Sequence, residues 1–293
     1  MKIVSITPVE VSALTSSVPL SETEWSAGTH NLGEQRRVGL DLYQVLVSST
    51  TDEPTAGAVA DPPTWGLLGK VNRWRMFDGS TLDQTTNADE ITVAITPGSI
   101  VNAVVFNRLG GGGEIRVWME DPTDGVVFDE TVSLIDNSNV VDFYTYCFEP
   151  FQQRFDLAFL NLPPYGAATI NAEITATNAA CAEMSIGFVR EIALTLNGTS
   201  VGTVRFGVRR TDAFGRTTFV RRQSVKRVNF EVIGPTASID RFVRILDNER
   251  DQPAVFIGSE LYDSLIVFGA YQDFEKTFSG PAYSDGTIRV EGL

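Results

Sequence analysis

Apolar and polar residues alternate with a period of two along most of the chain. Segments such as EITVAITPG, EIRVWMED and ATINAEITAT place an apolar side chain at every second position, and turn residues separate such segments. Successive side chains of a strand point to opposite faces of a sheet, so this period predicts many short strands that are buried on one face. The sequence therefore predicts an all-β to β-rich α+β protein.

The middle of the chain carries the densest run of such segments. About eight strands are expected between residues 70 and 190, which is typical of a jelly-roll sandwich. VDFYTYCFEP is interpreted as one of them, and the glycine run at 110–113 as a tight connection between two others. NRWRMFDGS alternates at Trp74 and Met76, which predicts the first strand of the sandwich with Trp74 facing inward.

One segment, residues 236–253, has helical periodicity instead. Thr236 or Ser238 is expected to cap the start of this helix and Pro253 to follow its end. We expect its apolar stripe to pack on a C-terminal sheet within residues 191–293. The stripe has the spacing i, i+3, i+4, i+7 and consists of Ile239, Phe242, Val243 and Leu246.

The C-terminal part also contains a long hairpin around the turn DAFG, and NGT at Asn197 is interpreted as a hairpin turn just before it. The long hairpin is strongly basic, and we expect it to contact the acidic surface of another subunit. A merely solvated face is the alternative, with nucleic acid less favoured. The expected contact residues are Arg205, Arg209, Arg210, Arg216, Arg221, Arg222, Lys226 and Arg227.

Charge is unevenly distributed along the chain. The formal net charge is −14, with 10 basic and 24 acidic side chains in residues 1–190 and 13 of each in residues 191–293. General nucleic-acid binders neutralise phosphates with clustered Lys and Arg, so this composition argues against nucleic acid as a partner. An acidic front part is expected to stay solvated while the neutral C-terminal part packs against neighbours.

Candidate reaction chemistry is sparse. Cys147 and Cys181 are the only cysteines and His30 is the only histidine, which excludes a structural zinc site and any Cys-His or Ser-His-Asp centre without His30. Both cysteines lie in apolar, strand-like contexts, so two buried free thiols are expected, with a disulfide between them as the alternative. Carboxylate pairs arise freely in a chain with 37 acidic residues, and no catalytic site is expected.

A structural Ca²⁺ is the one cofactor that the sequence suggests. DGSTLDQTTNAD supplies Asp78, Asp83 and Asp89 as hard oxygen ligands. The chain has no apolar run of about 18 residues, so we expect no membrane insertion. Its N-terminus lacks the apolar core of a signal peptide, which predicts synthesis and folding in a cytoplasm.

Residues 22–69 resemble a small chitin-binding-type carbohydrate-binding module. The resemblance is carried by Trp25, Gly33, Tyr43, Pro54 and Trp65 within EWSAGTHNLGEQRRVGLDLYQVLVSS and the following DEP and TW. It implies that the rings of Trp25, Tyr43 and Trp65 stack on sugar. The alternative is that these rings form a miniature core. The Ser-, Thr- and Pro-rich stretch at 48–64 is interpreted as a loop.

Nearly the whole chain resembles, in the order of its segments, virion proteins of the tail tip or baseplate of tailed bacteriophages. The matching segments include NRWRMFDG, VSLIDNSNVVDFYTYCFEPF, LNLPPYGAATINAEI and TIRVEGL. The resemblance implies a structural virion component with a galactose-binding-like jelly roll. Its partners would be other tail or baseplate proteins, further copies of itself in a trimer or hexamer, and a host surface polysaccharide.

Four units follow from these expectations. They are an N-terminal strand or arm at 1–21, the module at 22–69, the sandwich at 70–190 and an assembly domain at 191–293. The expected function is a structural role in a phage tail tip with contact to host surface glycan. A dedicated glycan-binding receptor protein is the alternative, and a glycan hydrolase is less favoured.

Overall fold

The computed structural model describes residues 1–136, 140–150 and 152–293. Strands make up 49% and helices 12% of the chain, which confirms the β-rich class. The segment VSLIDNSNVVDFYTYCFEPF contains residues 137–139 and 151, which lie outside the described residues.

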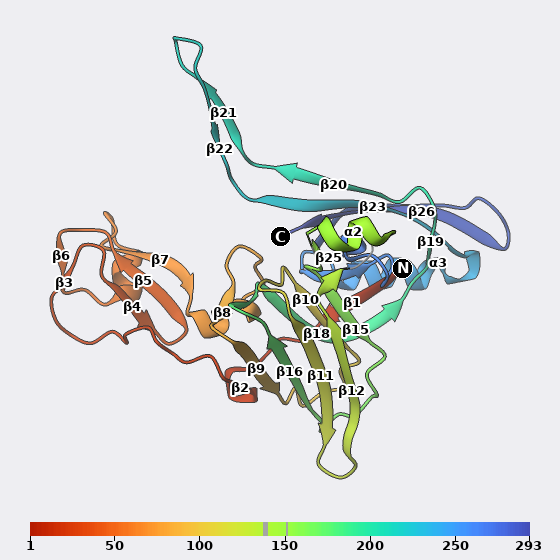
Figure 1. Cartoon of the computed structure of the whole chain (residues 1–293), viewed down its shortest axis with the longest axis horizontal. Helices are drawn as coiled ribbons and strands as arrows, with labels where there is room; N and C mark the ends of the chain where they lie inside the picture. The colour runs from red at the N-terminus through yellow and green to blue at the C-terminus, as the bar shows by residue number, and fades with distance from the viewer. Residues whose placement is uncertain (137–139, 151) are drawn as a thin grey trace.

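A ten-stranded antiparallel sheet runs through the body of the molecule (Figure 1). The N-terminal segment, expected as a strand or arm, contributes β1, which lies inside this sheet between β18 and β24, where Val4 is opposite Val189 and Val255. It therefore joins the middle and C-terminal parts of the chain into one sheet. The order is β15 (Leu157–Leu160), β10 (Ala103–Asn107), β18 (Glu183–Glu191), β1 (Lys2–Ile6), β24 (Ala254–Ile257), β25 (Ile266–Thr277), β26 (Tyr283–Gly292), β23 (Ser224–Pro235) and β19 (Leu194–Thr195), with β20 (Ser200–Arg205) also paired to β23.

A five-stranded sheet packs on the β10 and β18 end of the large sheet and completes a sandwich. Three of its strands, β9, β11 and β16, bury every second residue, as the period of two predicts, and the shared core includes Phe106, Ile91, Ile115 and Met119. The expected sandwich is thus confirmed. The order is β12 (Gly125–Ser133), β11 (Glu114–Asp121), β16 (Thr169–Thr175), β9 (Glu90–Ile95) and β2 (Leu14–Ser16).

The predicted C-terminal helix is confirmed as α3 (Ile239–Asn248). Its buried Phe242 and Leu246 pack against Phe230 of β23 and Phe256 of β24, so the apolar stripe covers one face of the large sheet. The expected side-chain cap is wrong. The hydroxyls of Thr236 and Ser238 donate to the carbonyls of Gly280 and Pro235, which leaves neither as a cap for the helix amides.

The module expected at 22–69 forms a separate lobe at the left of Figure 1. A three-stranded sheet and a two-stranded sheet enclose the buried indole of Trp65. The stretch expected as a loop contains a strand and a short helix, because Pro54 starts a helical turn whose inner face covers that indole. The elements are β3 (His30–Asn31), β4 (Gln35–Val38), β5 (Asp41–Val45), β6 (Ser49–Thr50), α1 (Pro54–Ala58) and β7 (Trp65–Lys70).

NRWRMFDGS is helical, which corrects the prediction of a strand. Residues 72–77 form the 3₁₀ helix η2 (Asn72–Phe77), with Trp74 and Met76 buried as expected. Thr85 competes for the hydrogen bonds that a strand needs, because its hydroxyl donates to the Asn72 carbonyl at 2.7 Å and accepts the Met76 amide at 2.9 Å. Arg75 donates to the Lys70 carbonyl rather than pairing with an acid.

VDFYTYCFEP is also helical, as α2 (Phe143–Phe148). Asp142 and Thr145 form a capping box, a local hydrogen-bond pattern that nucleates a helix against the β propensity of the aromatic residues. Both cysteines are free, but Cys147 on this helix is exposed, so the prediction of a buried thiol holds for Cys181 alone.

NGT forms a turn but not a hairpin. β19 and β20 on either side of Asn197 both pair with β23 and occupy one edge of that strand in succession.

The remaining short elements are β8 (Thr85–Asn87) paired with β17 (Ala179–Cys181), β13 (Ile135–Asp136) paired with β14 (Gln152–Gln153), and the 3₁₀ helices η1 (Val11–Ala13), η3 (Thr236–Ser238) and η4 (Asp263–Leu265).

Candidate functional site

A two-stranded arm projects from the body of the molecule (Figure 1). It consists of β21 (Val208–Thr211), β22 (Thr217–Val220) and the turn between them, and within the described part of the chain its strands pair only with each other. Every residue from 205 to 222 is exposed to solvent. The long hairpin expected from the sequence is thus present, and its outer half packs on no other element.

The arm presents aromatic and cationic side chains together. Phe214 at the turn is 90% exposed and Phe219 is 72% exposed, so their rings are nearly free of protein contact. The guanidinium of Arg209 lies 6.0 Å from the centre of the Phe219 ring, which is a cation–π contact. Asp212 fixes the turn because its carboxylate accepts the amides of Phe214 and Arg216.

The structure separates the eight basic residues expected to make subunit contacts into two sets. Lys226 and Arg227 lie on β23 at the base of the arm and pair with Asp156 and Glu291 of the same chain. The other six form no ion pair with any described residue. These unpaired arm cations are Arg205, Arg209, Arg210, Arg216, Arg221 and Arg222.

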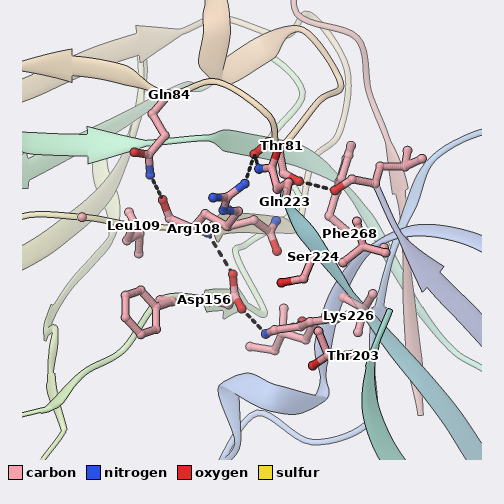
Figure 2. A pocket seen from close by; sticks show the side chains of 18 of the residues that line it. Thr81, Gln84, Arg108, Leu109, Asp156, Thr203, Gln223, Ser224, Lys226 and Phe268 are labelled. Carbon is pink, nitrogen blue, oxygen red and sulfur yellow. Dashed lines mark hydrogen bonds and ion pairs between the residues drawn. The ribbon is translucent and has the colours of Figure 1, made fainter. Parts of the chain in front are cut away.

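A cleft of about 650 Å³ opens where the arm joins the body (Figure 2), and we call it the root cleft. Strand β10 and the residues after it form one wall, β20 and the start of β23 form another, and β25 and the end of β26 form the floor. Its lining includes Asn107, Arg108, Asp156, Arg222, Lys226 and Phe268.

Hydrogen bonds tie the walls of the root cleft to one another. Asp156 accepts the Arg108 amide at 2.9 Å with one carboxylate oxygen, and Lys226 donates to the other. Arg108 and Gln223 both donate to the Thr81 carbonyl. The dashed lines of Figure 2 follow these bonds from Arg108 through Asp156 to Lys226. The side chains of the cleft are therefore held in fixed positions.

Two buried carboxyl groups lie in or next to the root cleft. Burial raises the pKa of Asp156, against the opposing effects of the Lys226 ammonium and the Arg108 amide. Burial also raises the pKa of Glu183 to about 8, against the Gly79 amide that donates to it at 3.1 Å, and the nearby Asp78 carboxylate raises it further. The protonated form of Glu183 is thus stabilised by the fold.

Asn107 has a buried donor without a partner. The residue is 3% exposed, it lines the root cleft, and its Nδ2 makes no hydrogen bond to any described residue. Buried amide donors are almost always paired in native proteins. Asn107 Nδ2 is thus a buried donor at the cleft wall that no described residue satisfies.

The three aromatic residues expected to stack on sugar come together in one core. Trp65 is fully buried, Tyr43 is 8% exposed, and Trp25 packs against both. The Trp65 indole also meets the His30 ring at 5.4 Å and donates to the Asp52 carbonyl at 3.1 Å. Sugar stacking needs an exposed ring face, so this packing favours the miniature-core interpretation.

The expected calcium ligands lie in the segment that begins with the turn at Asp78. Among the described residues, no three or more His, Cys, Asp or Glu side chains are grouped so that they hold a metal ion. The Asp78 carboxylate accepts the Ser80 amide at 2.8 Å, and burial raises the pKa of Asp78, with Asp83 adding to the shift. The Asp78 carboxylate therefore stabilises a local turn.

The root cleft is a feature that sequence reasoning missed. Asn107, Asp156 and Lys226 come from distant segments, and only tertiary pairing brings them together. The one local signal was a charged residue, Asp156, at the start of the apolar segment LAFL. The exposed rings of α2 were also missed, because the helix was interpreted as a strand; they are Phe143, Tyr144, Tyr146 and Phe148.

No protein-family model and no curated protein sequence matches the chain. Within the described residues, every helix is too short or too polar to cross a membrane.

Proposed function

We propose that this protein is a structural assembly subunit, a component of a bacteriophage tail tip or baseplate, and that its arm binds a neighbouring subunit. The phage context is supported by the resemblance of the chain's segments, in order, to tail-tip and baseplate virion proteins. The assembly role is supported by the arm itself.

The observation that carries the proposal is an exposed arm whose strands pair with no other strand of the described chain. An isolated two-stranded hairpin is marginally stable in water, so a surface that covers it would stabilise it. The arm combines Phe214 and Phe219 with the unpaired arm cations. Aromatic residues and Arg are enriched in protein interfaces, where both contribute strongly to binding energy.

The charge of the chain indicates the kind of surface that the arm binds. Residues 1–190 carry 24 acidic and 10 basic side chains, so a second copy offers an acidic surface to a basic arm. A contact between an arm and a different surface on the next copy is heterologous, and such contacts form a ring when the rotation between copies closes. A trimer or hexamer in a tail, together with other tail proteins, fits this mode of assembly.

The proposal is tested by measuring the mass of the purified chain in solution, with and without changes in the arm. We expect a trimer or hexamer for the wild type and a monomer for the combined variant Arg209→Gln, Arg216→Gln and Phe214→Ser. Arg244→Gln on the exposed side of α3 is the matched control and should keep the wild-type mass. An oligomer that survives the arm changes, or a wild type that stays monomeric, contradicts the proposal.

Contact with host surface glycan is a second candidate function, and the exposed rings of α2 favour it. Tyr144 is 68% and Phe148 71% exposed, and their ring centres lie 4.9 Å apart. Sugars bind to such exposed aromatic faces through their C–H groups. Pull-down on host polysaccharide should be lost in Tyr144→Ala with Phe148→Ala and kept in Phe278→Ala, another exposed aromatic. Equal retention of all three proteins contradicts this function.

A further inference from the structure

The root cleft has the construction of a small-molecule site. We propose that it binds a small organic monocarboxylate whose carboxylate accepts hydrogen bonds from Asn107 Nδ2 and from the guanidinium groups of Arg108 and Arg222. The cleft lies at the base of the arm and not on the faces of β21 and β22, and Arg222 is the unpaired arm cation that also lines it.

Asn107 provides the first line of argument. It follows Ala103 and Val105 at every second position of β10, so the three side chains share the face of the sheet that leads into the cleft. A buried donor without a partner costs on the order of 1–3 kcal/mol. An acceptor atom of a ligand beside Nδ2 removes that cost, so the site favours a ligand that carries an oxygen acceptor.

The unpaired cations of the cleft indicate that the acceptor group of the ligand is negatively charged. The side chains that line the cleft include three cations, Arg108, Arg222 and Lys226, and one carboxylate, Asp156. Leu293, whose backbone oxygen accepts the Thr81 hydroxyl, lines it as well. Lys226 and Asp156 pair with each other. The other two cations form no ion pair among the described residues. A guanidinium offers two parallel N–H groups that match the two oxygens of a carboxylate.

The walls of the cleft define the rest of the ligand. Leu109 and Phe268 are buried apolar walls, and Phe155 is an apolar residue at the rim, 54% exposed. The volume of about 650 Å³ lies within the range of roughly 300–1,000 Å³ that is typical of small-molecule sites. An apolar body next to the carboxylate covers these walls, which a bare phosphate ion cannot do. A monocarboxylate with a hydrocarbon body therefore fits best.

The test is calorimetric titration of the full chain with benzoate and hexanoate, with neutral benzamide and inorganic phosphate as comparisons. Saturable binding of a carboxylate, with no binding of benzamide, is the expected result. Phosphate that binds while both carboxylates do not would overturn the assignment of a monocarboxylate. The absence of saturable binding for every probe would overturn the site itself.

Two variants connect this binding to the named residues. Arg222→Gln should weaken carboxylate binding about tenfold, since a hydrogen bond to a charged group contributes about that much. The adjacent Arg221→Gln is the matched control, because Arg221 does not line the cleft and is equally exposed. Equal effects of the two changes contradict the proposal.

Asn107→Leu separates ligand binding from a structural role. Replacing a partnerless donor by an apolar group of similar size should leave the melting temperature equal or higher. The same variant should lose carboxylate binding. A folded Asn107→Leu protein that binds the carboxylate as well as the wild type would show that Nδ2 does not contact the ligand.

Discussion

The ammonium of Lys226 on β23 donates to the buried carboxylate of Asp156, the residue that precedes β15. β15 is the first strand of the ten-stranded sheet and β23 is the eighth along its order. The sheet therefore curls until strands from its two ends approach each other, and this ion pair joins them. The root cleft lies at the junction, so the same contact sets the base of the arm and the shape of the cleft.

Removal of Lys226 should destabilise the fold. In Lys226→Met the Asp156 carboxylate, whose side chain is 4% exposed, loses its counterion. Breaking a fully buried pair from one side costs about 3–5 kcal/mol because a buried charge is left without compensation. The Lys226 side chain is 37% exposed, so the cost here should lie below that range. Urea unfolding should show this loss, and the double variant Asp156→Asn with Lys226→Met should lose less. Arg227→Met, which breaks the more exposed pair with Glu291, should cost under about 1 kcal/mol. If the double variant loses as much stability as the sum of the losses in Asp156→Asn and Lys226→Met, the two residues are not coupled and the prediction is contradicted.

The contribution of Glu183 to the free energy of unfolding should fall as pH rises from acid to neutral. The pKa of this carboxyl is raised to about 8 in the folded chain. Below the ordinary pKa of a glutamate, Glu183 is protonated in both the folded and the unfolded chain, so the folded chain carries no cost for a buried charge there. As pH rises towards about 8, the unfolded chain loses this proton while the folded chain keeps it, and the free energy of unfolding falls. Urea unfolding at several pH values in this range measures the effect. The free energy of unfolding should fall less with pH in Glu183→Gln than in the wild type. An equal fall in both proteins contradicts the raised pKa of Glu183.

The lobe at 22–69 should be sensitive to Gly57. A Cβ at this position of α1 would lie 2.5 Å from Cδ1 of the Trp65 indole, far inside ordinary contact distance. Gly57→Ala should therefore destabilise the lobe by about 1–3 kcal/mol, although alanine is the better helix former. Gly28→Ala is the matched control, since nothing lies within 4 Å of its Cβ. Thermal unfolding followed by tryptophan fluorescence measures both, and equal melting curves contradict the packing at Gly57.

The two thiols should differ in reactivity. Cys147 on α2 is exposed, whereas Cys181 is fully buried and burial raises the pKa of its thiol. Since the thiolate is the reactive form, the native chain should titrate one thiol with a disulfide reagent and the denatured chain two. Cys147→Ser should leave none reactive in the native chain. Rapid reaction of two thiols without denaturant contradicts this difference.

The local pattern of the sequence determined much of the fold. The period of two in β9 and β11 predicted which side chains are buried, because a half-buried strand must alternate. The 3.6-residue period of α3 predicted its contact face in the same way. The arm was predicted because its two halves are joined by a turn and the strands are local in sequence.

The hydrophobic pattern gave wrong predictions where side-chain hydrogen bonds outweighed the strand propensity of a segment. The capping box of Asp142 and Thr145 makes α2 a helix in an aromatic segment that has strand propensity. The hydroxyl of Thr85 holds Asn72 and Met76 in a 3₁₀ turn although Trp74 and Met76 alternate as in a strand. These side-chain bonds are specific to position and leave no trace in a hydrophobic pattern.

Only the tertiary structure decided which residues form the candidate sites. Asn107, Asp156 and Lys226 meet because the long sheet curls, and pairing over such separations depends on the packing of the whole chain. The same holds for Trp65 and Trp25, whose aromatic rings suggest a sugar platform. Trp65 is buried in a small core and the partly buried Trp25 packs against that core. Sequence alone fixes which side chains are available and which face of each element is apolar. Exposure and convergence are properties of the folded surface, because they depend on what every other segment covers.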